Sequence, residues 1–144
     1  AAAGGRGMIN PDLIVDEAGD WLGASEQFGL DRVFLVAPSS TPERLALTTA
    51  HCSGFVYAAS TMGVTGAREQ IGELAPRLVE RTREFTDLPI GVGLGVRTPE
   101  HVREVGEYAD AVIVGSAFVS ALEQGTDQAR QLAEDLRDAT DRKR

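Results

Sequence analysis

Short runs of apolar residues alternate with longer amphipathic stretches along this chain. Leu88–Val92 and Ala111–Val114 are almost wholly apolar, and each leads through glycine into a helical pattern. Such runs are typical of parallel strands that are buried on both faces and joined by helical crossovers. The pattern predicts about five strands, which begin near Met8, Val33, Phe55, Ile90 and Ala111.

Capping signals mark the helices between these strands. Thr98-Pro99-Glu100 combines a threonine N-cap, a proline at the first helical position and an acid in the first turn. Pro38–Glu43 is a loop and N-cap before a second helix. The expected helices span Asp16–Phe28, Arg44–Ala50, Ile71–Phe85, Thr98–Tyr108, Ala117–Glu123 and Gln128–Ala139. The apolar side chains expected to face inward from three of them are Trp21, Leu22, Phe28, Leu74, Leu78, Val79, Leu132 and Leu136.

The repeated strand-helix order predicts an α/β fold of the (β/α)8 TIM-barrel family, present here as a single partial barrel domain over residues 1–144. A closed barrel needs eight strands and roughly 250 residues, so three strands are missing. The exposed edges should be the strands Gly7–Asn10 and Ala111–Val114. We therefore expect the chain to need a missing barrel half or to self-associate. Its first residues lack an initiator methionine and a signal pattern, which indicates a start within a longer protein.

The amino-acid composition excludes some classes of function. The chain has 144 residues, 42% of them hydrophobic and 25% charged, which is ordinary for a globular domain. A net charge of −8 with no basic patch before the last three residues argues against nucleic-acid binding. Cys52 is the single cysteine, and no apolar run reaches the length of a membrane span. We therefore predict a cytoplasmic location and no membrane partner.

Two consecutive strands end on glycine, which points to a phosphate site. Gly95 follows the strand Leu88–Val92, and Gly115-Ser116 follows the strand Ala111–Val114. Free backbone N–H groups beside a helix N-terminus bind anions, and glycine removes the Cβ that would block a phosphate. The alternative is that these glycines only make tight turns. The repetition at neighbouring strands favours a phosphate site.

A longer loop follows the third strand. Ser60–Glu69 contains Gly63 and Gly66, which could act as hinges, and Thr65, which offers a hydroxyl. Long loops at this position of a β/α scaffold are usually lids or binding loops, although a tolerated insertion is the alternative.

The remaining polar residues carry weaker signals. Asp12 lies in a loop after the first strand, where an acid is more often a turn or capping residue than a functional one. His51 and His101 lie at a helix end and in a helix first turn, with too few neighbouring ligands for zinc. The sequence therefore predicts no metal site.

These segments resemble one family in their order and spacing. Gly54–Tyr57 leads into Gly63–Arg68, and Pro89–Val96 and Val114–Ala117 follow. The arrangement is similar to that of the tryptophan synthase alpha chain, over about strands 4 to 8 of its barrel. The ends of two earlier strands are also similar, at Pro11–Leu13 and Phe34–Thr41.

The resemblance implies a lyase of tryptophan biosynthesis. The family cleaves indole-3-glycerol phosphate to indole and glyceraldehyde 3-phosphate in a retro-aldol step, and it passes indole to a beta subunit that carries pyridoxal phosphate. No cofactor is implied for this chain. The matching residues are Gly66, Gly95, Gly115 and Ser116 for the substrate phosphate, and Tyr57, Thr65 and Leu94 for the substrate pocket and its lid.

One departure from the family bears on activity. The family's two catalytic carboxylates, a glutamate and an aspartate, lie in the first half of the barrel and have no counterpart here. The catalytic residues of this chain are therefore unknown, and the isolated chain is expected to bind weakly and turn over nothing. Two alternatives stay open, namely another phosphate-binding barrel enzyme of histidine or tryptophan synthesis, and a non-catalytic half-barrel that serves as a binding or assembly module.

Overall fold

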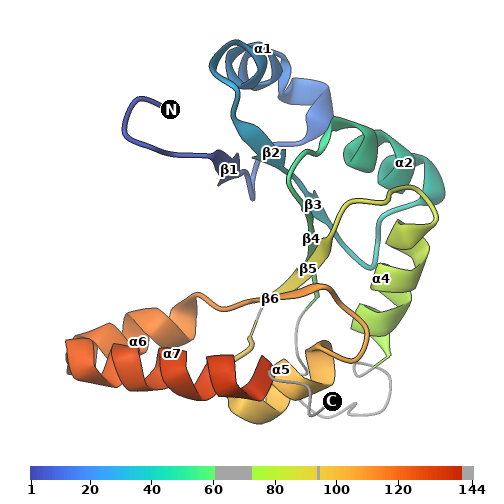
Figure 1. Cartoon of the computed structure of the whole chain (residues 1–144). Helices are drawn as coiled ribbons and strands as arrows, with labels where there is room; N and C mark the ends of the chain where they lie inside the picture. Colours follow the sequence, from blue (N-terminus) through green and yellow to red (C-terminus); the bar gives the residue numbers. More distant parts are fainter. Residues whose placement is uncertain (61–72, 94, 141–144) are drawn as a thin grey trace.

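The computed structural model describes residues 1–60, 73–93 and 95–140. Short strands alternate with helices through this part of the chain, and the helices lie along one side of the row of strands (Figure 1). The strands are β1 (Gly7–Ile9), β2 (Asp31–Val33), β3 (Leu35–Val36), β4 (Val56–Ala59), β5 (Ile90–Gly93) and β6 (Ala111–Ile113). The helices are η1 (Val15–Glu17, 3-10), α1 (Gly19–Phe28), α2 (Pro42–His51), α4 (Leu74–Arg83), α5 (Pro99–Val105), α6 (Ser116–Gln124) and α7 (Thr126–Thr140).

All strand pairs are parallel. β1 pairs with β2, while β3, β4, β5 and β6 pair in that order. β2 and β3 are two parts of one extended run interrupted at Phe34, whose carbonyl accepts a hydrogen bond from the Tyr57 amide at 3.2 Å. On the other side of this run, the Val33 carbonyl accepts from the Asn10 amide at 3.1 Å. The six short strands therefore correspond to the five predicted runs, and the predicted parallel βα order is confirmed.

The hydrophobic core lies between the strands and the helices. Side chains alternate along each strand, so Val56 and Val92 point toward the helices and are fully buried. Leu45 of α2, Leu78 of α4 and Val105 of α5 meet them and are at most 1% exposed. The opposite face of the strands carries the residues between these positions, including Tyr57, and is less covered. This second face is the one that concerns the candidate site.

The two ends of the strand row are exposed, as predicted. Met8 and Ile9 of β1 are 49% and 40% exposed. At the other end, Ala111 is exposed and Ile113 is half-buried. The expectation that Ala111–Val114 is buried on both faces is wrong, because β6 pairs only with β5 among the described strands. β6 therefore has the apolar sequence typical of a central strand but lies at the edge of the described strands, where its side chains are less buried.

The predicted helix caps are confirmed. The Thr41 hydroxyl accepts a hydrogen bond from the Arg44 amide at 3.3 Å, and Thr98 accepts from the His101 amide at 3.4 Å. Gly29 ends α1 with a φ of 63°, a left-handed conformation that glycine adopts without strain. In the described part of the chain, no helix is both long and apolar enough to cross a membrane.

Two predicted inward-facing residues lie elsewhere. Phe28 is 58% exposed, because it is the last residue of α1 and projects beyond the strands. Leu74 is 40% exposed as the first residue of α4, while the next residue, Ala75, is 4% exposed and belongs to the core. The inward positions of Leu78 and Val79 are confirmed, and so are those of Leu132 and Leu136.

At the amino-terminal end of β5, one carboxylate ties two strands and a helix together. Asp110 precedes β6, and its Oδ2 accepts hydrogen bonds from the Ile90 amide at 2.9 Å and from Arg83 of α4 at 2.9 Å. We expect Asp110→Ala to lower the free energy of unfolding by about 1–2 kcal/mol, because it leaves the strand amide without its partner. Urea denaturation measures this. Asp127→Ala is the control, since its ion pair is highly exposed, and an equal loss in both variants would contradict the assignment.

Candidate functional site

The two glycine loops lie at one edge of the sheet. β5 and β6 pair in a register that sets Gly93 opposite Ile113. Gly95 and Gly115 each follow these paired residues by two positions. Because parallel strands end at the same edge, the carboxyl edge of the sheet receives both loops. This common offset is the placement expected of a shared ligand site.

Gly95 holds a backbone conformation that few other residues adopt. Its φ is 89°, and the residue is exposed. The next residue, Val96, is 2% exposed and belongs to the core. The loop after β5 is therefore anchored by Val96, while Gly95 presents bare backbone to the surface. A side chain at this position would be strained as well as obstructive.

Gly115 and Ser116 begin helix α6. The Gly115 carbonyl accepts hydrogen bonds from the amides of Phe118 at 2.9 Å and Val119 at 3.2 Å, so Gly115 is the N-cap. Helix geometry leaves the amides at this end without partners inside the helix. A Cβ built on Gly115 would meet no heavy atom of residues 1–60, 73–93 and 95–140 within 4 Å. Open space therefore lies in front of backbone groups that suit an anion.

Tyr57 lies over Gly93, the last residue of β5, just before the glycine loop. A Cβ on Gly93 would lie 2.8 Å from Tyr57 Cζ and closer still to its hydroxyl oxygen. On the other side it would lie 3.0 Å from Ile113 Cβ. Gly93 therefore lacks a side chain because its neighbours on β4 and β6 occupy the space. Partial burial raises the pKa of Tyr57, so the phenol stays neutral at physiological pH.

Arg97 and Ser116 line the same cavity of about 490 Å³, whose remaining wall comes from α6 and α7. Arg97 follows Gly95 by two residues, and its exposed side chain brings a positive charge to this side of the α6 N-terminus. The sequence analysis did not single it out. Its position directly after the glycine loop was the available signal, because cations beside a glycine-rich strand end favour bound anions.

The structure brings four of the predicted site residues to the carboxyl half of the sheet, namely Tyr57, Gly95, Gly115 and Ser116. Three others, Thr65, Gly66 and Leu94, lie outside the described residues, and so does most of the predicted lid Ser60–Glu69. Ser60 itself is 2% exposed, and its amide donates to the Gly93 carbonyl at 3.3 Å.

The other polar candidates are exposed or are bonded to nearby backbone groups. Asp12 is exposed in the segment after β1. His51 ends α2, and its Nδ1 lies 2.9 Å from the Leu47 carbonyl oxygen, while Nδ1 of His101 lies 3.4 Å from the Arg97 amide. Among the described residues, no group of three or more histidine, cysteine or acidic side chains is placed to hold a metal ion.

Parallel strands that alternate with helices in this order define the class of β/α barrel proteins. Residues 1–143 match the family model described as "Tryptophan synthase alpha chain". The chain belongs to the tryptophan synthase alpha chain family. This confirms the resemblance inferred from the strand ends and places the fold among TIM barrels.

Relatives and solved structures agree on this family. The chain is 65% identical over 137 residues to the tryptophan synthase alpha chain of Mycobacterium avium, covering 94% of this chain and 51% of the relative. It superposes on a chain of Mycobacterium tuberculosis tryptophan synthase with a TM-score of 0.86 and 58% identity, covering 96% of this chain and 53% of that one. For the alpha subunit of Pyrococcus furiosus, the TM-score is 0.77 at 31% identity, with 94% and 56% covered. The chain thus spans about half the length of these relatives.

Proposed function

We propose that this chain is the phosphate-binding half of an alpha-type lyase that cleaves indole-3-glycerol phosphate to indole and glyceraldehyde 3-phosphate. The observation that carries the proposal is the common offset of Gly95 and Gly115 beyond the paired ends of β5 and β6. Family membership supplies the reaction. Because the chain spans about half of its relatives, the rest of the reaction site comes from polypeptide beyond these residues.

The phosphate is held mainly by the backbone. Amides of Gly95, Gly115 and Ser116 donate to its oxygens, and the α6 N-terminus adds a favourable dipole. Arg97 contributes a positive charge from the side of the same helix end. The family resemblance assigns Gly66 to the phosphate and Thr65 to the lid, and both residues lie outside the described part of the chain. These contacts fix one end of the substrate and leave the reacting bond to be positioned from that anchor.

The substrate's apolar part lies against the uncovered face of the strands. Tyr57 lies on this face, and its neutral phenol adds no charge to it. The family resemblance assigns Leu94, which lies outside the described residues, to the same part of the substrate. Cleavage breaks the bond between indole C3 and the adjacent glycerol carbon, while C3 gains a proton and the glycerol hydroxyl loses one. These transfers need positioned acid and base groups of suitable pKa. No acid of this chain carries the family's motif for that role, so the isolated chain binds phosphate without turnover.

The reaction partner is a tryptophan synthase beta subunit. Tryptophan synthase structures are among the matches of this chain. Indole released by the alpha chain is the substrate of the beta subunit, which carries the pyridoxal phosphate. The pathway is biosynthetic, and we assign it to the cytoplasm.

Titration with glycerol 3-phosphate tests the phosphate site. We expect saturable shifts of the backbone amide signals of Gly95, Gly115 and Ser116 in a folded, isotope-labelled sample. Gly115→Ala should weaken binding at least ~10-fold, because its methyl group enters space that none of the described residues fills. Ser116→Ala should weaken binding by only a few-fold, since the Ser116 amide remains.

Gly19→Ala is the matched control. Gly19 opens α1, and a Cβ there also meets no heavy atom within 4 Å, but it lies far from the carboxyl ends of β5 and β6. Its affinity for glycerol 3-phosphate should equal that of the unmodified chain. If amide signals near Gly95 and Gly115 do not move in a folded sample at saturating ligand, the proposed site is wrong.

A further inference from the structure

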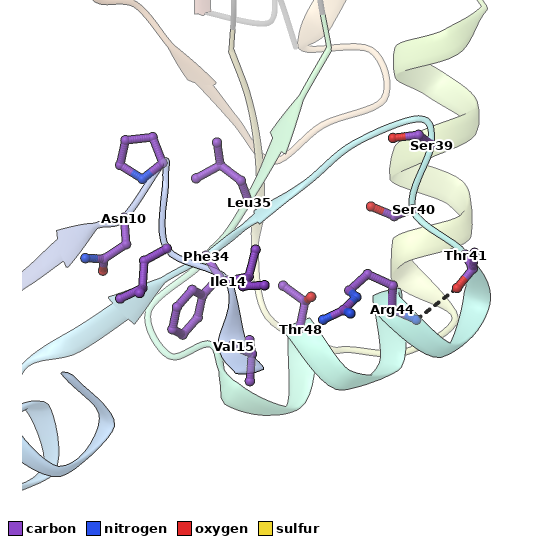
Figure 2. A pocket seen from close by; sticks show the side chains of 12 residues that line it. Asn10, Ile14, Val15, Phe34, Leu35, Ser39, Ser40, Thr41, Arg44 and Thr48 are labelled. Carbon is purple, nitrogen blue, oxygen red and sulfur yellow. Dashed lines mark hydrogen bonds between the residues drawn. The ribbon is translucent and has the colours of Figure 1, made fainter. Parts of the chain in front are cut away.

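A second cavity lies at the other end of the strand row, between α2 and the carboxyl ends of β1 and β3. We call it the α2 cavity. It has a volume of about 490 Å³, within the range typical of small-molecule sites. None of the residues predicted for the phosphate site lines it. Figure 2 shows two unlike walls, with Ile14, Val15 and Phe34 on one side and Ser39, Ser40 and Arg44 on the other.

Thr48 places an unpartnered hydroxyl in this cavity. The residue is 5% exposed, and none of the hydrogen bonds of the described chain uses its side chain. The other two buried helical threonines behave differently, since Thr49 donates to the Leu45 carbonyl at 2.9 Å and Thr82 to the Leu78 carbonyl at 2.7 Å. In Figure 2 the oxygen of Thr48 points toward Arg44. The hydroxyl is therefore free to donate a hydrogen bond to a ligand atom that enters the cavity.

Arg44 supplies the charge at the rim. Its side chain is 43% exposed, and Nη1 pairs with Asp16. The guanidinium group has further donors on Nη2 and Nε, which suit the planar geometry of a carboxylate. Arg44 lies one helical turn before Thr48 on α2, so both side chains lie on the same face of the helix.

The polar wall is held rigid from behind. Arg81 of α4 donates to the Pro38 carbonyl at 3.1 Å and to the Ser40 carbonyl. The Ser40 hydroxyl accepts from the Ala37 amide at 3.0 Å, which leaves its own proton available to donate. A wall fixed by these contacts loses little freedom when a ligand binds.

We propose that the α2 cavity binds a small amphipathic carboxylate. The apolar body of the ligand packs on Ile14, Val15 and Phe34, and its carboxylate accepts hydrogen bonds from Arg44 and Thr48. The recognition is local, because the chain as a whole carries a net charge of −8 and repels anions at long range. This site is additional to the phosphate site of the proposed function and does not depend on it.

Three related probes test the ligand class. The first is 3-phenylpropanoate, which has both a carboxylate and an apolar body. Its amide, 3-phenylpropanamide, lacks the charge, and acetate lacks the apolar body. In titrations of the isotope-labelled chain, we expect 3-phenylpropanoate to shift the amide signals of Ile14, Arg44 and Thr48 saturably. The other two probes should bind at least ~10-fold more weakly. Equal affinity for the acid and its amide, or saturable shifts confined to other residues, overturns the proposal.

Variants test the two anchoring residues. Thr48→Val and Arg44→Gln should each weaken 3-phenylpropanoate binding ~10-fold. Asp16→Asn should strengthen it by a few-fold, because it removes the carboxylate that competes for Arg44. Arg77→Gln is the control, since Arg77 is exposed on α4 and pairs with Glu73 away from the cavity. If Thr48→Val fails to fold, Arg44→Gln at the exposed rim and the three probes still test the proposal. Unchanged affinity for 3-phenylpropanoate in Arg44→Gln overturns it.

Discussion

Substitution of Gly93 by alanine is expected to lower the free energy of unfolding by about 2–3 kcal/mol, the upper part of the usual range for overpacking. The new Cβ would lie 2.8 Å from Tyr57 Cζ and 3.0 Å from Ile113 Cβ. Tyr57 belongs to β4 and Ile113 to β6, and both strands pair directly with β5. The Tyr57 ring must therefore swing out of its place or the sheet must open. Urea denaturation measures the loss.

Two other glycines serve as matched controls. Gly91→Ala should cost about 1 kcal/mol, because its closest neighbour is the flexible Cδ1 atom of Ile113 at 3.0 Å. Gly115→Ala should leave stability almost unchanged, since its Cβ meets open space. Adding Tyr57→Ala to Gly93→Ala should cost less than the sum of the single variants, because it removes the atoms in conflict. Because Gly→Ala by itself lowers the entropy of the unfolded chain and so favours folding, equal losses at all three glycines would contradict the assignment of the effect to packing against Tyr57.

The sequence predicted the elements well because their signals are local. A threonine followed by a proline predicted the starts of α2 and α5, and both threonines act as N-caps. Short apolar runs between glycines and prolines predicted the strands. The position of the Gly95 and Gly115 loops at one edge of the sheet also followed from the sequence, because both loops come directly after a strand and parallel strands end at one edge. Their equal offset came from the register of β5 with β6.

Contacts between distant segments could not be predicted in the same way. Phe28 and Leu74 have the right spacing for an inward face, yet each is the terminal residue of its helix and is exposed. The contact of Tyr57 with Gly93 depends on the register of β4 with β5, which periodicity leaves undetermined. The hydrophobic pattern predicts which residues are buried, but it does not predict which polar groups contact each other.

The α2 cavity illustrates this limit most clearly. Thr48 and Thr49 are adjacent buried threonines with the same intrinsic propensities, and only the fold separates them. Thr49 turns its hydroxyl back to the helix, whereas Thr48 turns toward a space formed by Ile14 and Phe34 from other elements. Arg81 likewise holds a loop that lies about forty residues earlier in the chain. Polar residues of this kind become candidates only once the tertiary arrangement is known.

The largest effect should come from supplying the rest of the barrel. The described strand row has exposed edges at β1 and β6, where unpaired backbone groups can accept further strands. A suitable partner is the amino-terminal half of the Mycobacterium avium alpha chain, since the matched part of that relative is 65% identical to this chain. We expect the two polypeptides to associate and to unfold together more cooperatively than this chain does alone.

Activity is the decisive readout for this association. Neither half should form glyceraldehyde 3-phosphate from indole-3-glycerol phosphate alone, because one lacks the phosphate loops and the other lacks the catalytic carboxylates. The mixture should form it, since association sets the carboxylates against a substrate anchored at Gly95 and Gly115. Gly115→Ala in the mixture should raise KM, whereas Asp127→Ala, exposed on α7, should leave KM and kcat unchanged. A stable one-to-one complex without cleavage would instead favour a non-catalytic binding module, and cleavage by this chain alone would mean that it contains an acid and a base in positions the family does not use.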